Sequence, residues 1–147
     1  MPIVFIGPPG SRKGTQAARL ATRLGLYHLS TGEVLREARD SGSQLGLEAA
    51  TYFELGRLVP DALVVQIVAQ RLDEVGVNKS FLFDGFPRTL PQAEALDLLL
   101  AVQGTPLDLV IEFEVDRAEL LRRLSTRGRI DDDEETARCR LEVYDKE

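Results

Sequence analysis

The sequence has one cysteine, Cys139, one histidine, His28, and no tryptophan among its 147 residues. A single cysteine excludes an internal disulfide and a cysteine-rich zinc site, and it fits a protein of a reducing compartment. No apolar run approaches the roughly 20 residues that a membrane-spanning helix needs, and the first residues lack the pattern of a secretion signal. We therefore expect a cytoplasmic protein that has no membrane partner.

Basic residues are fewer than acidic ones. The chain has 18 lysines and arginines against 24 aspartates and glutamates, which gives a net charge of −6. The acidic excess is concentrated in residues 131–147, which hold eight acids and three bases. A nucleic-acid duplex requires a basic face, so we expect no nucleic-acid partner. A local cluster of arginines around a smaller anion stays compatible with this charge.

Short apolar runs alternate with helical patterns along the chain. The length, with 44% hydrophobic and 29% charged residues, is typical of one globular domain, 1–147. Apolar runs predict buried strands over residues 3–6, 27–29, 81–83 and 109–113. Apolar residues at helical spacing predict helices over residues 13–23, 31–39, 44–53, 61–75, 91–102, 117–125 and from 133 to the end. The alternation predicts an α/β fold, with a parallel sheet and helices on both of its faces.

A glycine-rich segment with a lysine, Gly-Pro-Pro-Gly-Ser-Arg-Lys-Gly-Thr at 7–15, lies between the first predicted strand and the first predicted helix. A phosphate-binding loop (P-loop) needs glycines for a tight turn, inward-pointing backbone N–H groups, and a lysine that reaches the terminal phosphates. The following helix adds the positive end of its dipole, and Thr15 supplies a hydroxyl near the phosphates. An ordinary glycine- and proline-rich turn is the alternative. The flanking strand and helix favour phosphate binding.

Arg12 departs from the usual form of this loop, which has glycine directly before the lysine. If the backbone needs a positive φ at this position, a residue with a Cβ atom costs about 1–2 kcal/mol. The Arg12 side chain could instead turn outward and add positive charge at the mouth of the pocket. The sequence leaves both interpretations open.

Several segments in a fixed order resemble the adenylate kinase family, and together they cover essentially the whole chain. The loop at 7–16 is similar to the phosphate-binding loop of that family. Three further segments resemble signatures of the family: Leu-Ser-Thr-Gly-Glu-Val-Leu-Arg at 29–36, Gly-Arg-Leu-Val-Pro-Asp at 56–61, and Asp-Gly-Phe-Pro-Arg-Thr at 84–89. Further along, Arg127, Arg129 and Arg140 match the arginines that flank and follow the family's lid.

The resemblance implies a P-loop kinase core that reversibly transfers the terminal phosphoryl group of ATP to AMP, with Mg²⁺ as cofactor. Phosphoryl transfer asks the protein mainly for alignment and charge neutralisation, which explains an arginine-rich site in an acidic protein. The resemblance gives the catalytic roles to Lys13, Arg88, Arg127, Arg129 and Arg140. By the same resemblance, Asp84 would hold the Mg²⁺ through water.

Substrate contacts follow from the same resemblance. The residues implied for ATP are Gly10, Ser11, Arg12, Lys13, Gly14, Thr15, Arg123 and Arg127, with Arg123 packed on the adenine. The residues implied for AMP are Thr31, Arg36, Arg57, Leu58, Val59, Gly85, Phe86, Pro87, Arg88, Gln92, Arg129 and Arg140. A helical AMP-binding insert is expected over 30–59. Thr31 and Gln92, expected near the base, favour AMP over a pyrimidine monophosphate.

Two regions depart from the family pattern. Only Gly128 separates Arg127 from Arg129 at the place of the lid, so residues 126–132 are expected to form a minimal lid remnant. The lack of cysteines excludes the zinc-stapled form of the lid, and we expect no zinc. The family continues with a further strand and a closing helix, without which a sheet edge would be uncovered and ATP binding weaker.

Two alternatives to adenylate kinase activity stay open from the sequence. A kinase for UMP or CMP would share the phosphate loop and the arginines. A catalytically weak nucleotide-binding module would fit Arg12 and the reduced lid. In each case we expect a monomer, and for the leading interpretation the partners are ATP and AMP.

Overall fold

Four parallel strands form one sheet in the order β2-β3-β1-β4 in the computed structural model, which describes residues 1–76, 79–126 and 134–146. In the register of the sheet, Ile3 lies opposite both Leu82 and Leu109. The predicted strands are confirmed, with ends within one residue of the expected ones. The strands are β1 Ile3–Ile6, β2 Tyr27–Ser30, β3 Phe81–Asp84 and β4 Leu109–Glu112.

The helices appear in the predicted order, and the first six have ends within one residue of the expected ones. The last helix was expected to run to the end of the chain, but it ends at Tyr144 and residues 145–146 form a turn. Gly25, in the left-handed region, ends the first helix, and the Ser30 and Thr89 hydroxyls cap two others. The expected start of the last helix at Asp133 lies outside the described residues. The helices are α1 Lys13–Leu24, α2 Thr31–Asp40, α3 Gln44–Phe53, α4 Asp61–Val75, α5 Leu90–Val102, α6 Arg117–Thr126 and α7 Glu134–Tyr144.

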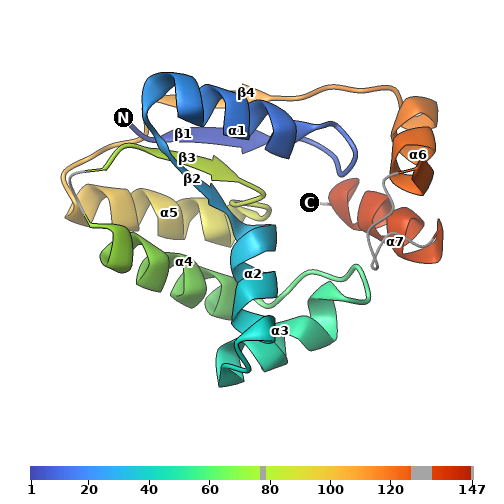
Figure 1. Ribbon diagram of the computed structural model, residues 1–147, viewed down its shortest axis with the longest axis horizontal. Helices are drawn as coiled ribbons and strands as arrows, with labels where there is room; N and C mark the ends of the chain where they lie inside the picture. The colour runs from blue at the N-terminus through green and yellow to red at the C-terminus, as the bar shows by residue number, and fades with distance from the viewer. Residues whose placement is uncertain (77–78, 127–133, 147) are drawn as a thin grey trace.

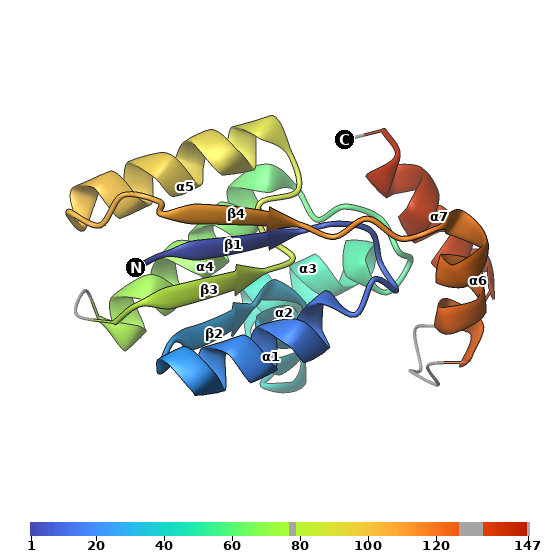
Figure 2. The same ribbon diagram turned by 90° about the horizontal axis from the view of Figure 1, so that it is seen from above.

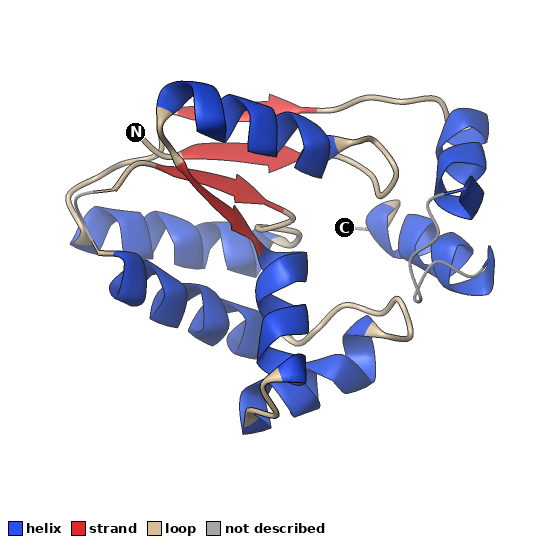
Figure 3. Cartoon of the chain, in the orientation of Figure 1, coloured by secondary structure: helices blue, strands red, loops and turns tan. Residues whose placement is uncertain are grey.

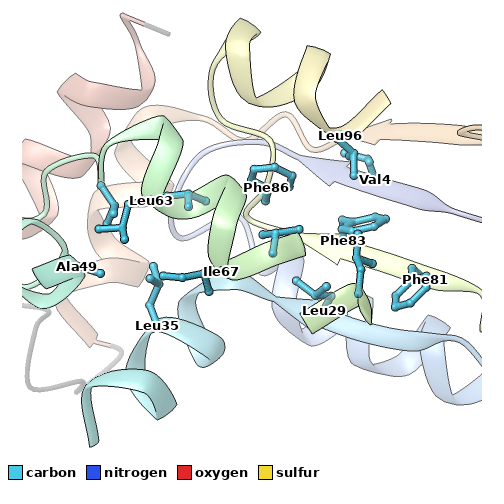
Figure 4. Close-up of a cluster of buried hydrophobic side chains, with 14 of the residues drawn as sticks. Val4, Leu29, Leu35, Ala49, Leu63, Ile67, Phe81, Phe83, Phe86 and Leu96 are labelled. Atoms are coloured by element: carbon cyan, nitrogen blue, oxygen red, sulfur yellow. The ribbon is translucent and has the colours of Figure 1, made fainter. Parts of the chain in front are cut away.

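Helices cover the sheet from both sides, α1 on one face and α4 with α5 on the other (Figures 1 and 2). Alternate residues of β1 point to the two layers. Val4 packs with Phe83 and Leu96 in the larger cluster, which Figure 4 shows, whereas Phe5 packs with Ala17 beneath α1. This two-sided burial explains why β1 is apolar at every position.

The edge strand β4 differs from the buried strand that its apolar sequence predicts. Leu109 and Val110 are each 48% exposed, whereas no residue from Ile3 to Phe5 exceeds 3%. Among the described residues, β1 is the only element that packs closely on β4. Helical cover on both faces therefore holds at the centre of the sheet and not at this edge.

The carboxyl ends of the strands point toward one side of the molecule, where α2, α3, α6 and α7 also lie (Figure 1). After β1 the chain turns to one face of the sheet, and after β3 it turns to the other. In open parallel sheets, ligands bind at such a switch between neighbouring strands. The loops that meet there are drawn in tan in Figure 3. No helix in the described part of the chain is long and apolar enough to cross a membrane.

Candidate active site

The loop between β1 and α1 wraps around the side chain of Lys13. The Lys13 ammonium Nζ donates hydrogen bonds to the carbonyl oxygens of Gly7, at 2.5 Å, and Pro8, at 3.0 Å. Lys13 is also the first residue of α1, so its charge adds to the positive end of the helix dipole. The loop therefore collects positive charge and backbone N–H groups around a small space, which is the arrangement that binds phosphate.

Arg12 has a left-handed backbone, with φ 66° and ψ 22°, directly before α1. Among the described residues it is the only one other than glycine with a positive φ. The loop thus keeps a glycine-like conformation at this position and does not rearrange around the Cβ atom, at a cost of about 1–2 kcal/mol. The side chain is exposed and lines the cavity described below.

Replacement of Arg12 by glycine is expected to stabilise the protein by about 1 kcal/mol, because glycine adopts the left-handed conformation without strain. We also expect tighter ATP binding, since the N–H groups of a relaxed loop align better with the phosphates. Urea unfolding and ATP titration measure the two effects. Arg12→Ala removes the same charge but keeps the Cβ atom, so it isolates the backbone effect. Weaker ATP binding in Arg12→Gly would show instead that the guanidinium contacts the nucleotide.

Asp84 ends β3 beside the start of α1. A Cβ atom on Gly14 would lie 3.1 Å from Asp84 Oδ2, so the carboxylate lies directly against the helix that follows the phosphate loop. The Asp84 side chain is 12% exposed and lines the cavity. Oxygen donors of this kind suit Mg²⁺, which usually keeps several waters and shares its protein site with substrate phosphates.

His28 is a site residue whose importance the sequence did not reveal. Its side chain is largely buried, and its Nε2 lies 3.4 Å from Asp84 Oδ2. The contact exists because β2 pairs with β3, which places Ser30 opposite Asp84. The contact between His28 and Asp84 depends on the strand order, which the local sequence around His28 does not reveal.

Gly85, in the turn after β3, joins two predicted AMP-binding residues. Its carbonyl oxygen accepts hydrogen bonds from Thr31 Oγ1, at 2.9 Å, and from Arg88 Nε, at 2.8 Å. A Cβ atom on Gly85 would lie 2.9 Å from Thr31 Oγ1, so the close approach requires glycine. The start of α2 is thereby fixed to the turn that carries Arg88.

The charge environment of Arg88 is unusual. The residue is exposed at the cavity wall, yet desolvation by the surrounding atoms lowers the pKa of its guanidinium. The charge of Arg140 lowers the pKa further, and Asp84 opposes both effects. Two cations whose charges interact at one cavity wall favour a polyanion between them.

A cavity of about 1070 Å³ brings most of the predicted site residues together. Four predicted AMP-binding residues, Thr31, Val59, Phe86 and Gln92, are buried and do not line it. Arg36 does, with its guanidinium 5.8 Å from the centre of the Phe53 ring. The predicted residues on the wall are Gly10, Ser11, Arg12, Lys13, Gly14, Thr15, Arg36, Arg57, Leu58, Asp84, Gly85, Pro87, Arg88, Arg123 and Arg140.

Helix α6 brings a cluster of charges to the phosphate loop. Arg123 donates to Glu119 Oε1 at 2.6 Å and to the Gly10 carbonyl at 3.5 Å. Glu119 also accepts two bonds from Arg122, and the bonds from both arginines lower the pKa of its carboxyl to about 2. Two residues of this cluster were not predicted from the sequence: Arg122, which lines the cavity, and Glu119. Their helical spacing was a visible signal.

Helix α7 contacts the loop that follows α3. A Cβ atom on Gly56 would lie 3.0 Å from Thr136 Cγ2 and 3.2 Å from Arg140 Cγ, and Cys139 Sγ lies 3.9 Å from the Gly56 carbonyl oxygen. Arg140 is thereby placed against the expected AMP-binding insert. The predicted residues Arg127 and Arg129 lie outside the described residues, as do residues 127–132 of the expected lid remnant.

In the described part of the chain, no group of three or more His, Cys, Asp or Glu side chains could hold a metal ion. Among the carboxylates on the cavity wall, that of Asp84 lies directly against Gly14, at the start of the helix that follows the phosphate loop. This fits a metal that arrives with nucleotide phosphates.

Comparison with known proteins identifies the family. The family model for adenylate kinase matches residues 5–147. An adenylate kinase of Synechococcus sp. (strain RCC307) is 53% identical, over 97% of this chain and 77% of its own length. Adenylate kinases of Azorhizobium caulinodans and Mycobacterium sp. (strain MCS) are each 48% identical, over 100% and 98% of this chain and 81% and 80% of their own lengths. With a phosphate loop, an aspartate and converging arginines around one cavity, and with matches over nearly its full length, this chain belongs to the adenylate kinase family.

Proposed function

We propose that the protein reversibly transfers the terminal phosphoryl group of ATP to AMP, giving two molecules of ADP. The observation that carries the proposal is the single cavity that joins Lys13 of the phosphate loop to Asp84, Arg88 and Arg140. Its volume of about 1070 Å³ is slightly above the usual range for a site that binds one small molecule. The names of the curated relatives do not favour the pyrimidine kinase and the weak binding module that the sequence left open.

The phosphate-loop side of the cavity is proposed to hold ATP. Lys13 would exchange its carbonyl contacts for oxygens of the terminal phosphates, and the first N–H groups of α1 would bind the same anion. Arg123, held by Glu119 beside Gly10, would pack on the adenine or the adjoining ribose. These groups bind and orient the donor.

The opposite side of the cavity is proposed to hold AMP. Arg36 and Arg88 would bind its phosphate through paired guanidinium N–H groups, which match phosphate oxygens well. Arg57, Leu58, Val59 and Gly85 would contact the nucleotide through their backbones. Thr31 and Gln92 lie behind this wall and would shape the space for the base.

Between the two nucleotides, the chain neutralises charge as the phosphoryl group moves in line from one oxygen to the other. Arg140 and Arg88, whose charges interact, would contact the transferred group from the α7 side and the β3 side. Asp84 would hold Mg²⁺ through water, and the metal supplies charge neutralisation at the ATP phosphates. Arg127 and Arg129 are proposed to take part in the same step.

Acceptor choice tests this proposal. With ATP and Mg²⁺, we expect kcat/KM for AMP to exceed that for UMP or CMP at least about tenfold, a difference of roughly 1.4 kcal/mol in transition-state binding. A coupled assay of ADP formation measures it, with a bisubstrate dinucleotide inhibitor as the control for contaminating enzymes. Preference for a pyrimidine acceptor would support the UMP/CMP kinase, and nucleotide binding without turnover would support the weak binding module.

We further propose that the protein acts as a monomer in the cytoplasm, without nucleic-acid or membrane partners. The one-domain organisation, the single cysteine and the net charge of −6 support these proposals.

A further inference from the structure

Asp61, the first residue of α4, accepts two hydrogen bonds through one carboxylate oxygen. Gln92 Nε2 donates to Asp61 Oδ1 at 2.7 Å, and Thr89 Oγ1 donates to the same oxygen at 2.9 Å. Both donors belong to the start of α5, some thirty residues later in the chain. Hydrogen bonds to a carboxylate are roughly twice as strong as those between neutral groups.

Gln92, which is bonded to Asp61, is also bonded to Arg88. The Gln92 side-chain oxygen Oε1 accepts a hydrogen bond from the backbone N–H of Arg88 at 2.8 Å, and the Gln92 residue is only 1% exposed. An ionised carboxylate can only accept and a peptide N–H can only donate, so one orientation of the amide satisfies both ends. Asp61, Gln92 and the Arg88 backbone therefore form a directional chain of hydrogen bonds.

This series of hydrogen bonds ends at Arg88, which lies in the site. The Arg88 side chain lines the cavity and is bonded through Nε to the Gly85 carbonyl, so the position of its guanidinium depends on the turn from Gly85 to Thr89. Asp61 does not line the cavity, and its influence on the reaction must pass through that turn.

We propose that Asp61 is a positioning residue for the acceptor: it fixes the turn that presents Arg88 to the phosphate of AMP. The proposal rests on the proposed function, in which Arg88 binds that phosphate. Displacement of a binding group by about 1 Å can cost up to a hundredfold in rate, so loss of the Asp61 acceptor affects AMP strongly. ATP is bound from the other side of the cavity and keeps its affinity.

The decisive variant is Asp61→Leu, which preserves size and removes both acceptor bonds. We expect KM for AMP to rise about tenfold and kcat/KM for AMP to fall by at least the same factor, while KM for ATP stays within about twofold. Asp61→Asn keeps an oxygen that can accept both bonds, and it should restore KM for AMP to within about threefold of the parent. Val75→Ala, at the other end of α4, is the matched control: Val75 packs against the large core cluster, so its truncation lowers stability without touching the network.

A double-mutant cycle separates positioning from general loosening. Gln92→Met breaks the same chain from its other end, and it also keeps the test valid if Asp61→Leu does not fold. Gln92→Met should raise KM for AMP at least about tenfold. In the double variant, KM for AMP should not exceed that of the more affected single variant, because the effects of coupled residues are not additive.

Two results would overturn the inference: an unchanged KM for AMP in either single variant, or effects that multiply in the double variant. Equal increases in KM for AMP and ATP, also seen in Val75→Ala, would show general loosening and overturn it as well. Failure of the proposed function is distinguishable, since the parent protein would then not phosphorylate AMP at all.

Discussion

Replacement of Lys13 by methionine is expected to lower kcat at least about a hundredfold, which corresponds to about 2.7 kcal/mol of transition-state stabilisation. Methionine has a similar length but no charge, so the variant removes the ammonium that sits within the phosphate loop. Charge placed where a transition state needs it is worth most in a site that excludes water, because the local dielectric is low.

The control for this variant is Arg23→Met, which removes a cation from the last turn of the same helix at an exposed position. It should leave kcat within about twofold, because exposed charges far from the reaction are screened by solvent and salt. Steady-state kinetics and circular dichroism on both proteins give rate and fold. Near-normal turnover in a folded Lys13→Met protein would remove Lys13 from the mechanism.

Replacement of Gly46 by alanine is expected to destabilise the protein by about 2–3 kcal/mol, as overpacked positions typically do. This is opposite in sign to the usual effect of glycine-to-alanine changes in helices, which gain about 1 kcal/mol. Gly46 is buried in the first turn of α3, where α3 packs on α2. A Cβ atom there would lie 2.2 Å from the carbonyl carbon of Ala38 and 2.5 Å from the backbone nitrogen of Arg39. Backbone atoms cannot rotate away as a flexible side chain can, so the two helices must separate.

Thermal unfolding measures this effect, and a loss of this size should lower Tm by roughly 5–10 °C in a chain of this length. Gly42→Ala is the matched control. Gly42 has φ 71° but nothing within 4 Å of an added Cβ atom, so alanine there carries only the conformational cost, about 1–2 kcal/mol. AMP affinity should fall more than ATP affinity in Gly46→Ala, since α2 and α3 form the proposed AMP-binding insert. A Tm at or above that of the parent would contradict the prediction.

Most of the fold could be predicted because local signals determine it. The Ile-Val-Phe-Ile run predicted β1 since only a strand covered on both faces is apolar throughout. Apolar residues at helical spacing predicted α1 over residues 13–23, and the pattern Lys-Gly-Thr after a glycine-rich turn predicted the phosphate loop and the strain at Arg12. Each of these depends on residues within one or two turns of chain.

The remaining features depend on which distant segments become neighbours. The contact of His28 with Asp84 requires β2 to pair with β3, and the bonds to Asp61 require α5 to begin beside the start of α4. The exposure of Val110 results from the position of β4 at the sheet edge. None of these is encoded in a local pattern. From the sequence, Asp61 is the first residue of a predicted helix and the last residue of the 56–61 segment, and neither place predicts its bonds to Thr89 and Gln92.

The strand order has a consequence for how the chain folds as it is synthesised. β1 is made first, yet its partners β3 and β4 follow at great distance in sequence: Ile3 pairs with Leu82 and with Leu109. Its apolar side chains therefore have no native strand partner until β3, at Phe81–Asp84, has left the ribosome. Proteins with such non-local strand pairings fold more slowly than helical bundles of similar stability. The entropy cost of closing a long loop comes before any stabilising contact can form. During this interval the nascent chain exposes an aggregation-prone strand, and chaperones that bind extended apolar segments would recognise it.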